Sequence, residues 1–399
     1  MAEFPMVLIL AGLAAYAVLG GADFGAGLWE LGARGPGGAA IREHTHRAMA
    51  PVWEANHVWL IFVLVICWTA YPTAFASIAS TLTIPFFIAG IGVILRGASY
   101  AFRTGDPGGR EASALSLMLS LSSVLTPFAL GAAAGGIASG RVPVGNAAGD
   151  ALSSWLNPTS MLVGALAVAS AAYTAAIYLA GDARREGLDD LAETFRKRAL
   201  VSGALVGAIA VCGPLVLHED ATPLYNGLSS GAGLAAGLVS GIAGVTTLVL
   251  VHRRRFEPAR ASAALAVAAI VAGWGLAQEP SFLPGLTLEE AAAEDATLVA
   301  IAVSVGFGML ILLPSLALLF RLVLSGRFDP GTESPDTAAG TTRSVKPGIP
   351  PRAVAATAGI GGVVTLLAEG WLLGVGVALM LSGAVLAFLL LAAPEEESA

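Results

Sequence analysis

The chain has 399 residues, of which 56% are hydrophobic and only 12% are charged, and its mean hydropathy of +0.78 lies far above that of soluble globular proteins. We therefore expect an integral membrane protein. The net charge of -7 gives no general basic surface, which argues against nucleic acid as a partner. The two cysteines, Cys67 and Cys212, form no CxxC pair, so neither a disulfide framework nor a cysteine-based metal site is indicated.

Apolar runs of about 20 residues, the length that crosses the hydrocarbon layer, recur along the chain. The first run has no basic residue ahead of it and no convincing cleavage site, so we interpret it as structure rather than as a signal peptide. These runs predict a polytopic body over residues 1–322. The predicted transmembrane helices are 6–28, 48–71, 74–102, 113–138, 158–180, 199–217, 230–251, 261–278 and 297–322.

The distribution of basic residues orients these helices. With the N-terminus outside, all of the 21 Lys and Arg residues except Arg96, Arg141 and Arg321 fall in cytoplasmic segments. The opposite orientation would violate the positive-inside rule at every loop. The segments predicted to face the cytoplasm are 29–47, 103–112, 181–198, 252–260 and 323–352.

Two further parts follow the ninth helix. Residues 323–352 include "FDPGTESPDTAAGTTRSVKPGIPPR", which is rich in Pro, Gly, Ser and Thr and is typical of a flexible linker. Residues 353–392 are apolar except at Glu369 and Gly370, which predicts two short helices that cross the membrane and return. We therefore expect 353–399 to be a C-terminal transmembrane hairpin with an acidic tail inside the cell.

Ionisable side chains inside the spans are candidates for function, because each one placed in lipid costs several kcal/mol. They are Asp23, Glu54, His57 and Arg96. Asp23 lies near the inner end of the first helix, Glu54 about two turns into the second from the cytoplasm, and Arg96 roughly one to two turns from the inner end of the third. We expect a carboxylate pair, partly neutralised by Arg96 and reached by cytoplasmic water, as a proton entry path requires.

Glycines surround the first of these residues. Gly21 and Gly25 form a small-xxx-small step and Gly27 follows, so the first helix can pack against a neighbour at backbone distance. Asp23 lies between the first two glycines. This arrangement would shield its carboxylate from lipid.

The second helix combines several chemical types within one turn. Glu54 and His57 share a face, and Trp53 and Asn56 form the adjacent pair. The combination suits proton handling or contact with a planar ligand, although Asn56 would also serve simply to bridge helices. We expect no metal site at His57, because no second histidine inside a span could complete an axial pair.

The same stretches resemble a known family. "LGGADFGAGLWELGAR", "REHTHRAMAPVWEANHVWLIF", "TAYPTAFA" and "ILRGASYAFR" are similar to subunit II of the cytochrome bd-type quinol oxidases, most specifically over roughly the first 105 residues. The resemblance implies an all-α fold with two four-helix bundles plus one peripheral helix, in the cytoplasmic membrane of a bacterium or archaeon. It also implies pairing with a subunit I that carries haem b and haem d and oxidises quinol, the two together reducing dioxygen to water.

The resemblance assigns roles to individual positions. Glu54 corresponds to an acidic residue on a proton path towards the partner's haems, and Asp23 and Arg96 match the family's motifs on the first and third helices. Trp53 matches a tryptophan that in some members lies against a structural quinone, with Asn56 beside it. Membrane lipids are further expected partners, and the C-terminal hairpin would either pack on the periphery of the body or hold a small accessory subunit.

The chain departs from the family pattern at three points. Glu54 stands where aspartate is usual, which keeps a titratable group but adds a methylene. Ala55 replaces glycine, and His57 replaces glutamine or glutamate, which would alter the path or add a relay member. The C-terminal hairpin has no counterpart in the family.

Two other classes of function would account for part of this pattern. A proton-coupled secondary transporter would also place carboxylates and an arginine inside the membrane, but broken helices would be expected in two corresponding halves. Here the polar residues concentrate in the first three spans. A purely structural scaffold would leave Asp23, Glu54 and Arg96 unexplained.

Overall fold

The computed structural model describes residues 1–33, 37–49, 53–102 and 109–324, and five isolated positions beyond them: Ala356, Thr357, Ile360, Leu379 and Ser382. The chain divides into two compact units, Met1–Leu313 and Pro314–Ala399. Nearly all of the predicted linker (323–352) and of the predicted hairpin (353–399) lies outside the described residues. The description below concerns the first unit.

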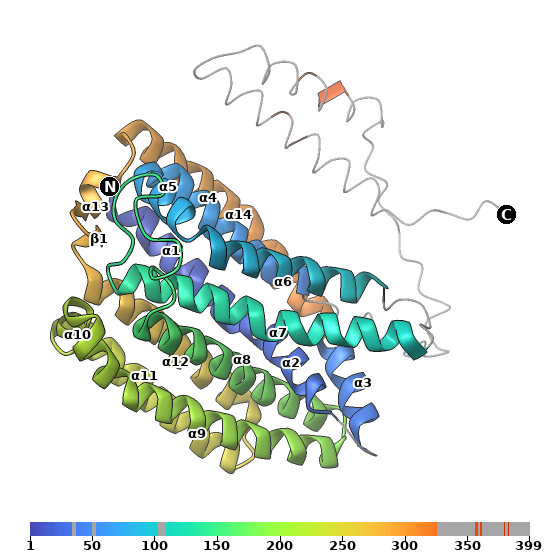
Figure 1. The fold of residues 1–399 in the computed structure, drawn as a ribbon. Helices are drawn as coiled ribbons and strands as arrows, with labels where there is room; N and C mark the ends of the chain where they lie inside the picture. Colours follow the sequence, from blue (N-terminus) through green and yellow to red (C-terminus); the bar gives the residue numbers. More distant parts are fainter. Residues whose placement is uncertain are drawn as a thin grey trace. The chain divides into compact units, whose positions relative to one another are not determined.

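The described chain is almost entirely helical, which confirms the predicted all-α class (Figure 1). The elements in order are α1 Glu3–Ala15, the π-helical turn η1 Tyr16–Gly20, α2 Gly21–Leu31, α3 Gly38–Met49, α4 Trp53–Ala70, α5 Pro72–Thr81, α6 Thr83–Phe102, α7 Gly109–Ala138, α8 Pro158–Arg185, α9 Asp189–Asp220, α10 Thr222–Leu228, α11 Gly231–His252, α12 Phe256–Gln278, the strands β1 Ser281–Leu283 and β2 Leu286–Thr287, α13 Leu288–Ala291 and α14 Asp295–Leu324.

Eight helices in the described part are long and apolar enough to cross a membrane. The first of them is the continuous rod Glu3–Leu31, made of α1, η1 and α2. A ninth, shorter apolar helix covers Asn56–Ala70 within α4. These segments coincide with the runs expected from hydropathy. The sequence and the helix lengths therefore agree on a multi-pass membrane protein. The grouping into two four-helix bundles stays a prediction.

Two predicted helices differ in detail. The helix expected over 74–102 is interrupted at Leu82, where α5 ends before α6 begins at Thr83. Pro85 accounts for the interruption, because its ring would clash with the carbonyl group of residue 81 in a continuous helix. Of the helix expected over 48–71, the structure describes α4 from Trp53 onward, and the helix α3 extends to Met49, with residues 50–52 outside the described residues.

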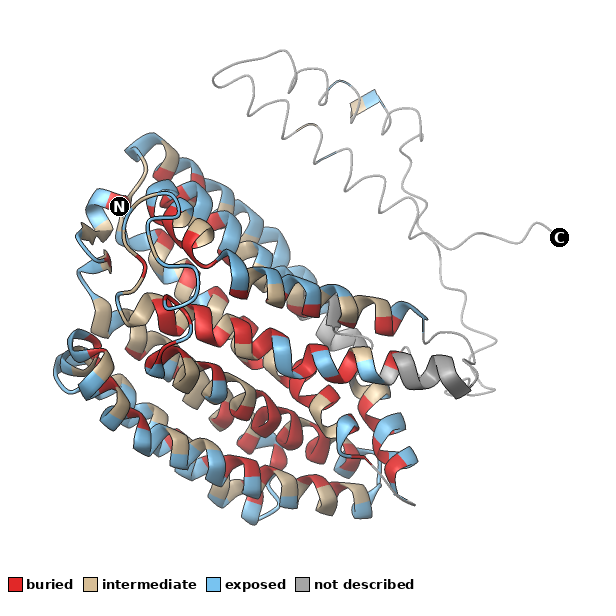
Figure 2. Ribbon diagram, viewed as in Figure 1, coloured by how far each residue is buried: buried red, intermediate tan, exposed pale blue. Residues whose placement is uncertain are grey.

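Burial is uneven across the unit. More than half of the span residues in α7 and α8 are buried (56% each), compared with 17% in α11 and in α12. Figure 2 shows this contrast, with buried residues concentrated on α2, α7 and α8 and exposed residues along α9 and α11. The exposed side chains of α9 and α11 are apolar, for example Val211 and Ile242, as expected of helices that face lipid or another membrane subunit.

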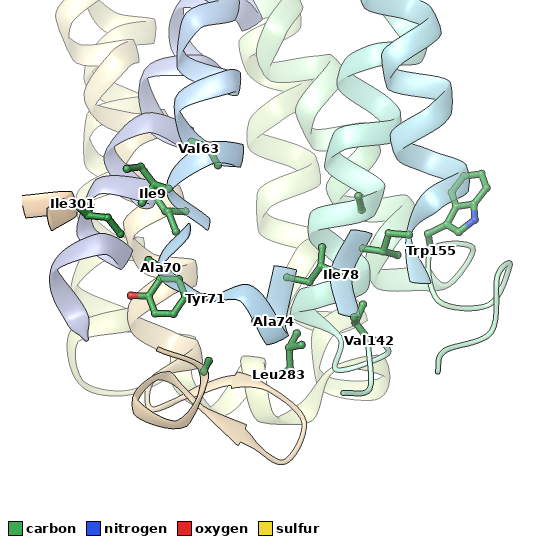
Figure 3. Packing of buried hydrophobic residues seen from close by; sticks show 14 of the residues in the cluster. Ile9, Val63, Ala70, Tyr71, Ala74, Ile78, Val142, Trp155, Leu283 and Ile301 are labelled. Carbon is green, nitrogen blue, oxygen red and sulfur yellow. The ribbon is translucent and has the colours of Figure 1, made fainter. Parts of the chain in front are cut away.

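The two ends of the helices are built differently. Near the N-terminus, α10, α13 and the β1–β2 hairpin lie together (Figure 1), and an apolar cluster that includes Tyr71, Val142 and Leu283 fills the space between them and the helices (Figure 3). At the opposite end lie α3 and the α8–α9 connection. A second apolar cluster there includes Phe195, Val251 and Phe256.

Candidate functional site

An arginine and an aspartate form a fully buried ion pair between α2 and α6. Arg96 donates from Nε to Oδ2 of Asp23 and from Nη2 to Oδ1, each at 2.6 Å. Both side chains are 0% exposed. The fork of the guanidinium group matches both carboxylate oxygens, which makes this one of the stronger hydrogen-bonding arrangements in proteins.

The remaining donors of Arg96 are also used. Nη1 donates to Oγ of Ser123 on α7 at 3.1 Å, and Nη2 donates to the backbone carbonyl oxygen of Asp23. The hydroxyl of Tyr100, one turn after Arg96 on α6, donates to Oδ1 of Asp23 at 3.0 Å. A buried charge is tolerated only when it is paired and hydrogen-bonded in this way. The cluster therefore joins α2, α6 and α7 through polar contacts.

Glycines allow the helices to approach closely enough for these contacts. A Cβ atom on Gly27 would lie 2.1 Å from Oγ of Ser123, and one on Gly25 would lie 1.9 Å from the carbonyl oxygen of Ala171 on α8. Trp29, one turn after Gly25, donates from Nε1 to the carbonyl oxygen of Ala172 at 2.8 Å. The glycine-rich sequence of α2 thus places Asp23 where three neighbouring helices shield it.

Phe24 brings the ion pair close to the second helix. Cζ of Arg96 lies 4.8 Å from the centre of the Phe24 ring, and the ring of His57 meets Phe24 edge-on with centroids 5.9 Å apart. The His57 ring makes a similar contact with Tyr16, at 6.0 Å. His57 on α4 therefore lies among aromatic rings of the first helix, next to the Asp23–Arg96 pair.

Asn56 connects α4 to the π-helical turn. Its Nδ2 donates to the carbonyl oxygen of Leu19 at 3.2 Å, and the residue is 6% exposed. Leu19 lies in η1, and π-helical turns are rare and often occur at functional sites. Of the two roles left open for Asn56, the structure shows the bridge between helices.

The side chains of Trp53 and Glu54 lie outside the described residues, but the helix that carries them is described. The described part of α4 begins at Trp53, so Glu54 lies in its first described turn. Residues 50–52 lie outside the described residues, and the expected depth of Glu54, about two turns into a span starting at 48, stays a prediction.

Helix α3 covers the end of this cluster. The ring of His46 stacks on Tyr100, with centroids 5.7 Å apart and planes 21° apart. His44, 1% exposed, donates from Nε2 to the carbonyl oxygen of Leu179 at 3.1 Å, and its Nδ1 lies 3.4 Å from the Glu186 carboxylate. These contacts hold α3 against α8 and place His46 beside the hydroxyl-bearing ring that contacts Asp23.

Several of these residues were not foreseen from the sequence. Tyr100 had a usable signal, because it lies four residues after Arg96 on the same helical face. Ser123 had none, because a serine in a serine-rich apolar helix is unremarkable.

Comparisons with known proteins agree with one another. Residues 1–323 match the family model described as cytochrome bd terminal oxidase subunit II. Among curated proteins, the "Putative cytochrome bd menaquinol oxidase subunit II" of Bacillus subtilis (strain 168) is 23% identical over 217 residues, which is 53% of this chain and 61% of that protein. The match thus spans less than two thirds of the relative's length.

A solved structure extends the likeness over most of the chain. The structure of bd oxidase from Geobacillus thermodenitrificans contains a chain that superposes with a TM-score of 0.64 at 26% identity. The match covers 81% of this chain and 98% of that one.

Proposed function

The chain belongs to the cytochrome bd terminal oxidase subunit II family, and on this premise we propose that it is the non-haem subunit of a respiratory quinol oxidase. It would pair with a haem-bearing subunit I in the cell membrane, and the pair would oxidise quinol and reduce dioxygen to water. The family match over residues 1–323 carries the proposal. This chain would contribute a proton path and structural support for its partner.

A proton path is the chemistry that best suits the polar residues inside the membrane. Reduction of dioxygen to water consumes protons as well as electrons, and those protons must reach a site enclosed by apolar protein. Titratable groups buried in a membrane are costly and mark such routes. Glu54, at the start of α4, and His57, one turn further in, are the members of the route that can gain and lose a proton.

We assign Asp23 and Arg96 a different part in the same route. Both oxygens of Asp23 already accept hydrogen bonds from Arg96 or Tyr100. Protonation of this carboxyl group would break charge-assisted bonds and leave Arg96 buried without a counterion. The pair therefore acts as a fixed electrostatic anchor beside His57, while Glu54 and His57 carry the proton.

The haems of the complex, haem b and haem d, would be bound by subunit I. The His57 ring faces the rings of Tyr16 and Phe24, and this division of labour would leave the handling of protons to this chain.

A structural quinone is a further component of the proposal. Trp53 would supply a flat ring for it at the start of α4. The amide nitrogen of Asn56 already donates to Leu19, so this residue would orient the helix near the quinone rather than serve as its main hydrogen-bond donor.

Substitutions of Glu54 in the assembled complex test the proton path. Glu54→Gln keeps the shape and the hydrogen-bonding capacity but cannot titrate, so it should assemble with full haem content and consume oxygen much more slowly. Glu54→Asp restores the usual family residue and should retain much of the activity. Oxygen consumption with quinol as donor is the measurement, normalised to haem. A Gln variant that turns over at the wild-type rate would show that Glu54 is not on the path.

A further inference from the structure

A cavity lined by arginines lies where α8, α9, α11 and α12 end. It has a volume of about 460 Å³, and its charged lining consists of Arg184, Arg185, Arg254, Arg255 and Glu257. A second cavity of about 240 Å³ shares Arg184, Arg254 and Phe256 with it. The two cavities thus share part of their lining. The larger one has four arginines and one carboxylate, and the smaller one adds the carboxylates of Asp189, Asp190 and Glu193.

These arginines are available to an additional anion. Arg184 pairs with Asp189, Arg185 with Asp182, and Arg254 with Glu193 at 3.1 Å. The three arginine side chains are 61%, 53% and 66% exposed, and ion pairs exposed to this degree contribute little stability. Within the described residues, no ion pair or side-chain hydrogen bond involves Arg255. Arg184, Arg185 and Arg254 are thus each paired with a carboxylate, with Glu257 also 3.9 Å from Arg185, and in this described part of the chain Arg255 is the lining arginine that carries a positive charge without such a partner.

One of these arginines, Arg254, has a strained backbone conformation. Arg254 has φ 58, in the left-handed region, and follows the end of α11. The amide of Arg255 donates to the carbonyl oxygen of Leu250 at 2.9 Å and that of Arg254 donates to Val251 at 3.0 Å, which is the Schellman arrangement that normally uses glycine. The turn after α8 does use one, Gly187 with φ 74.

An arginine at this position disfavours the turn that it occupies. We therefore expect the Arg254 side chain to have a role that glycine could not fill, as a positively charged part of the cavity lining. Arg254 lines both cavities.

The floor and the surroundings of the cavity indicate the class of ligand. Phe256 and Pro258 provide apolar lining, and α11 and α12, whose ends form the cavity, are candidate membrane spans. Exposed apolar side chains such as Val249 and Leu265 continue along them. The cavity thus lies at the level of lipid headgroups, with cations for a phosphate and apolar surface for the adjoining chains.

We propose that this cavity binds the phosphate of an anionic phospholipid headgroup. Arg184, Arg254 and Arg255 would contact the phosphate oxygens, since guanidinium groups match phosphate geometry, and the acyl chains would lie along α11 and α12. Basic pockets between transmembrane helices recognise anionic headgroups in this way. This site is separate from the Asp23–Arg96 cluster and does not depend on the proposed proton path.

Neighbouring arginines allow a matched test. Arg253 is exposed and adjacent in sequence but lines neither cavity. If these arginines serve only as a topological signal, Arg253 and Arg255 should be equivalent. If the cavity binds a headgroup, Arg255 should matter and Arg253 should not.

The experiment uses the assembled complex, stripped of lipid in detergent and reconstituted in nanodiscs. Discs of phosphatidylcholine alone are compared with discs that also contain phosphatidylglycerol, and bound lipid is quantified by native mass spectrometry after mild release. Arg255→Gln should weaken retention of phosphatidylglycerol about fivefold, the effect expected for one arginine at a membrane surface. Arg184→Gln combined with Arg255→Gln should weaken it further, and Arg253→Gln should behave as wild type.

Two outcomes would overturn the proposal. Equal losses for Arg253→Gln and Arg255→Gln would indicate diffuse surface charge, and unchanged retention in the double variant would show that the cavity does not bind lipid. A third arm adds millimolar inorganic phosphate to phosphatidylcholine discs. The midpoint temperature of thermal unfolding is measured in these discs and in the discs with phosphatidylglycerol. If free phosphate raises it as much as phosphatidylglycerol does, the ligand of the cavity is inorganic phosphate and not a lipid headgroup. Haem content, measured on every variant, verifies assembly.

Discussion

Asp23 and Arg96 lie 73 positions apart in the chain, yet their side chains are both fully buried and share two hydrogen bonds of 2.6 Å. The pair fixes α2 against α6 in one orientation, because the planar guanidinium group donates to both carboxylate oxygens at once. Removing one member of the pair should cost much more folding free energy than the intact pair contributes, since the other member is then a buried charge without a partner.

Asp23→Asn should therefore lower the stability of the assembled protein by roughly 3–5 kcal/mol. Combining it with Arg96→Gln should recover part of that loss, because the second change removes the unpaired charge. Thermal unfolding in detergent, analysed as a double-mutant cycle, measures the coupling. Strictly additive effects of the two substitutions would contradict the pairing.

Two glycines on α2 offer a matched comparison of helix packing. A Cβ atom on Gly25 would lie 1.9 Å from the carbonyl oxygen of Ala171, whereas one on Gly21 would lie 3.8 Å from its Cα atom. Gly25→Ala should force α2 away from α8 and strongly reduce the yield of assembled complex. Gly21→Ala should assemble normally. The yield, measured as haem-containing complex from membranes, should separate the two variants, and equal yields would contradict the close approach.

His57 should contribute to the rate of oxygen consumption if it relays protons. His57→Gln keeps a hydrogen-bonding side chain but cannot carry a proton, so the rate should fall severalfold while haem content is unchanged. His218→Gln is the control, because His218 is an exposed histidine that pairs with the neighbouring Glu219 far from the cluster. An unchanged rate in the His57 variant would remove it from the path.

Truncation after Ser325 tests the role of the C-terminal part. The predicted linker separates this part from the transmembrane body, so the truncated chain should still assemble with haem and retain at least some quinol oxidation. Haem spectra and oxygen consumption of the purified complex provide the measurement. Complete loss of the assembled oxidase would mean that residues beyond 325 belong to its core.

Expression without the partner subunit tests where the haems bind. The chain alone should insert into the membrane and show no haem absorbance after purification. A stable haem spectrum from the isolated chain, reproduced after extensive washing, would contradict the proposed division of labour.

The helices were predictable because lipid imposes a simple length and polarity on each span. The contact between Asp23 and Arg96 was also within reach, since two opposite charges at one depth in an apolar medium stabilise each other. Ser123 and Phe24 were not, because neutral and aromatic side chains are common in membrane helices and reveal their partners only when the helices are placed. The break at Leu82 had a signal in Pro85 that hydropathy alone does not use.

The glycines illustrate the same limit. The spacing of Gly21 and Gly25 predicted a close helix contact. In the structure, Gly25 lies against the backbone of α8, whereas Gly21 has room for a Cβ atom. Which glycine meets the neighbouring backbone depends on the crossing point of the two helices. Sequence spacing defines the face and leaves that point undetermined.

The π-helical turn Tyr16–Gly20 has a consequence for insertions and deletions in the first helix. A π turn takes up one residue more than the corresponding α turn, whereas one residue in a regular helix rotates everything after it by about 100°. The turn therefore absorbs an additional residue without rotating Asp23 away from Arg96. A chain lacking one residue within 16–20 could close the turn as regular α-helix and keep the same side chains facing α6. Length variation among related chains is thus expected to concentrate in this turn and to be excluded between Asp23 and Trp29, where an insertion would rotate Gly25, Gly27 and Trp29 away from their contacts on α7 and α8.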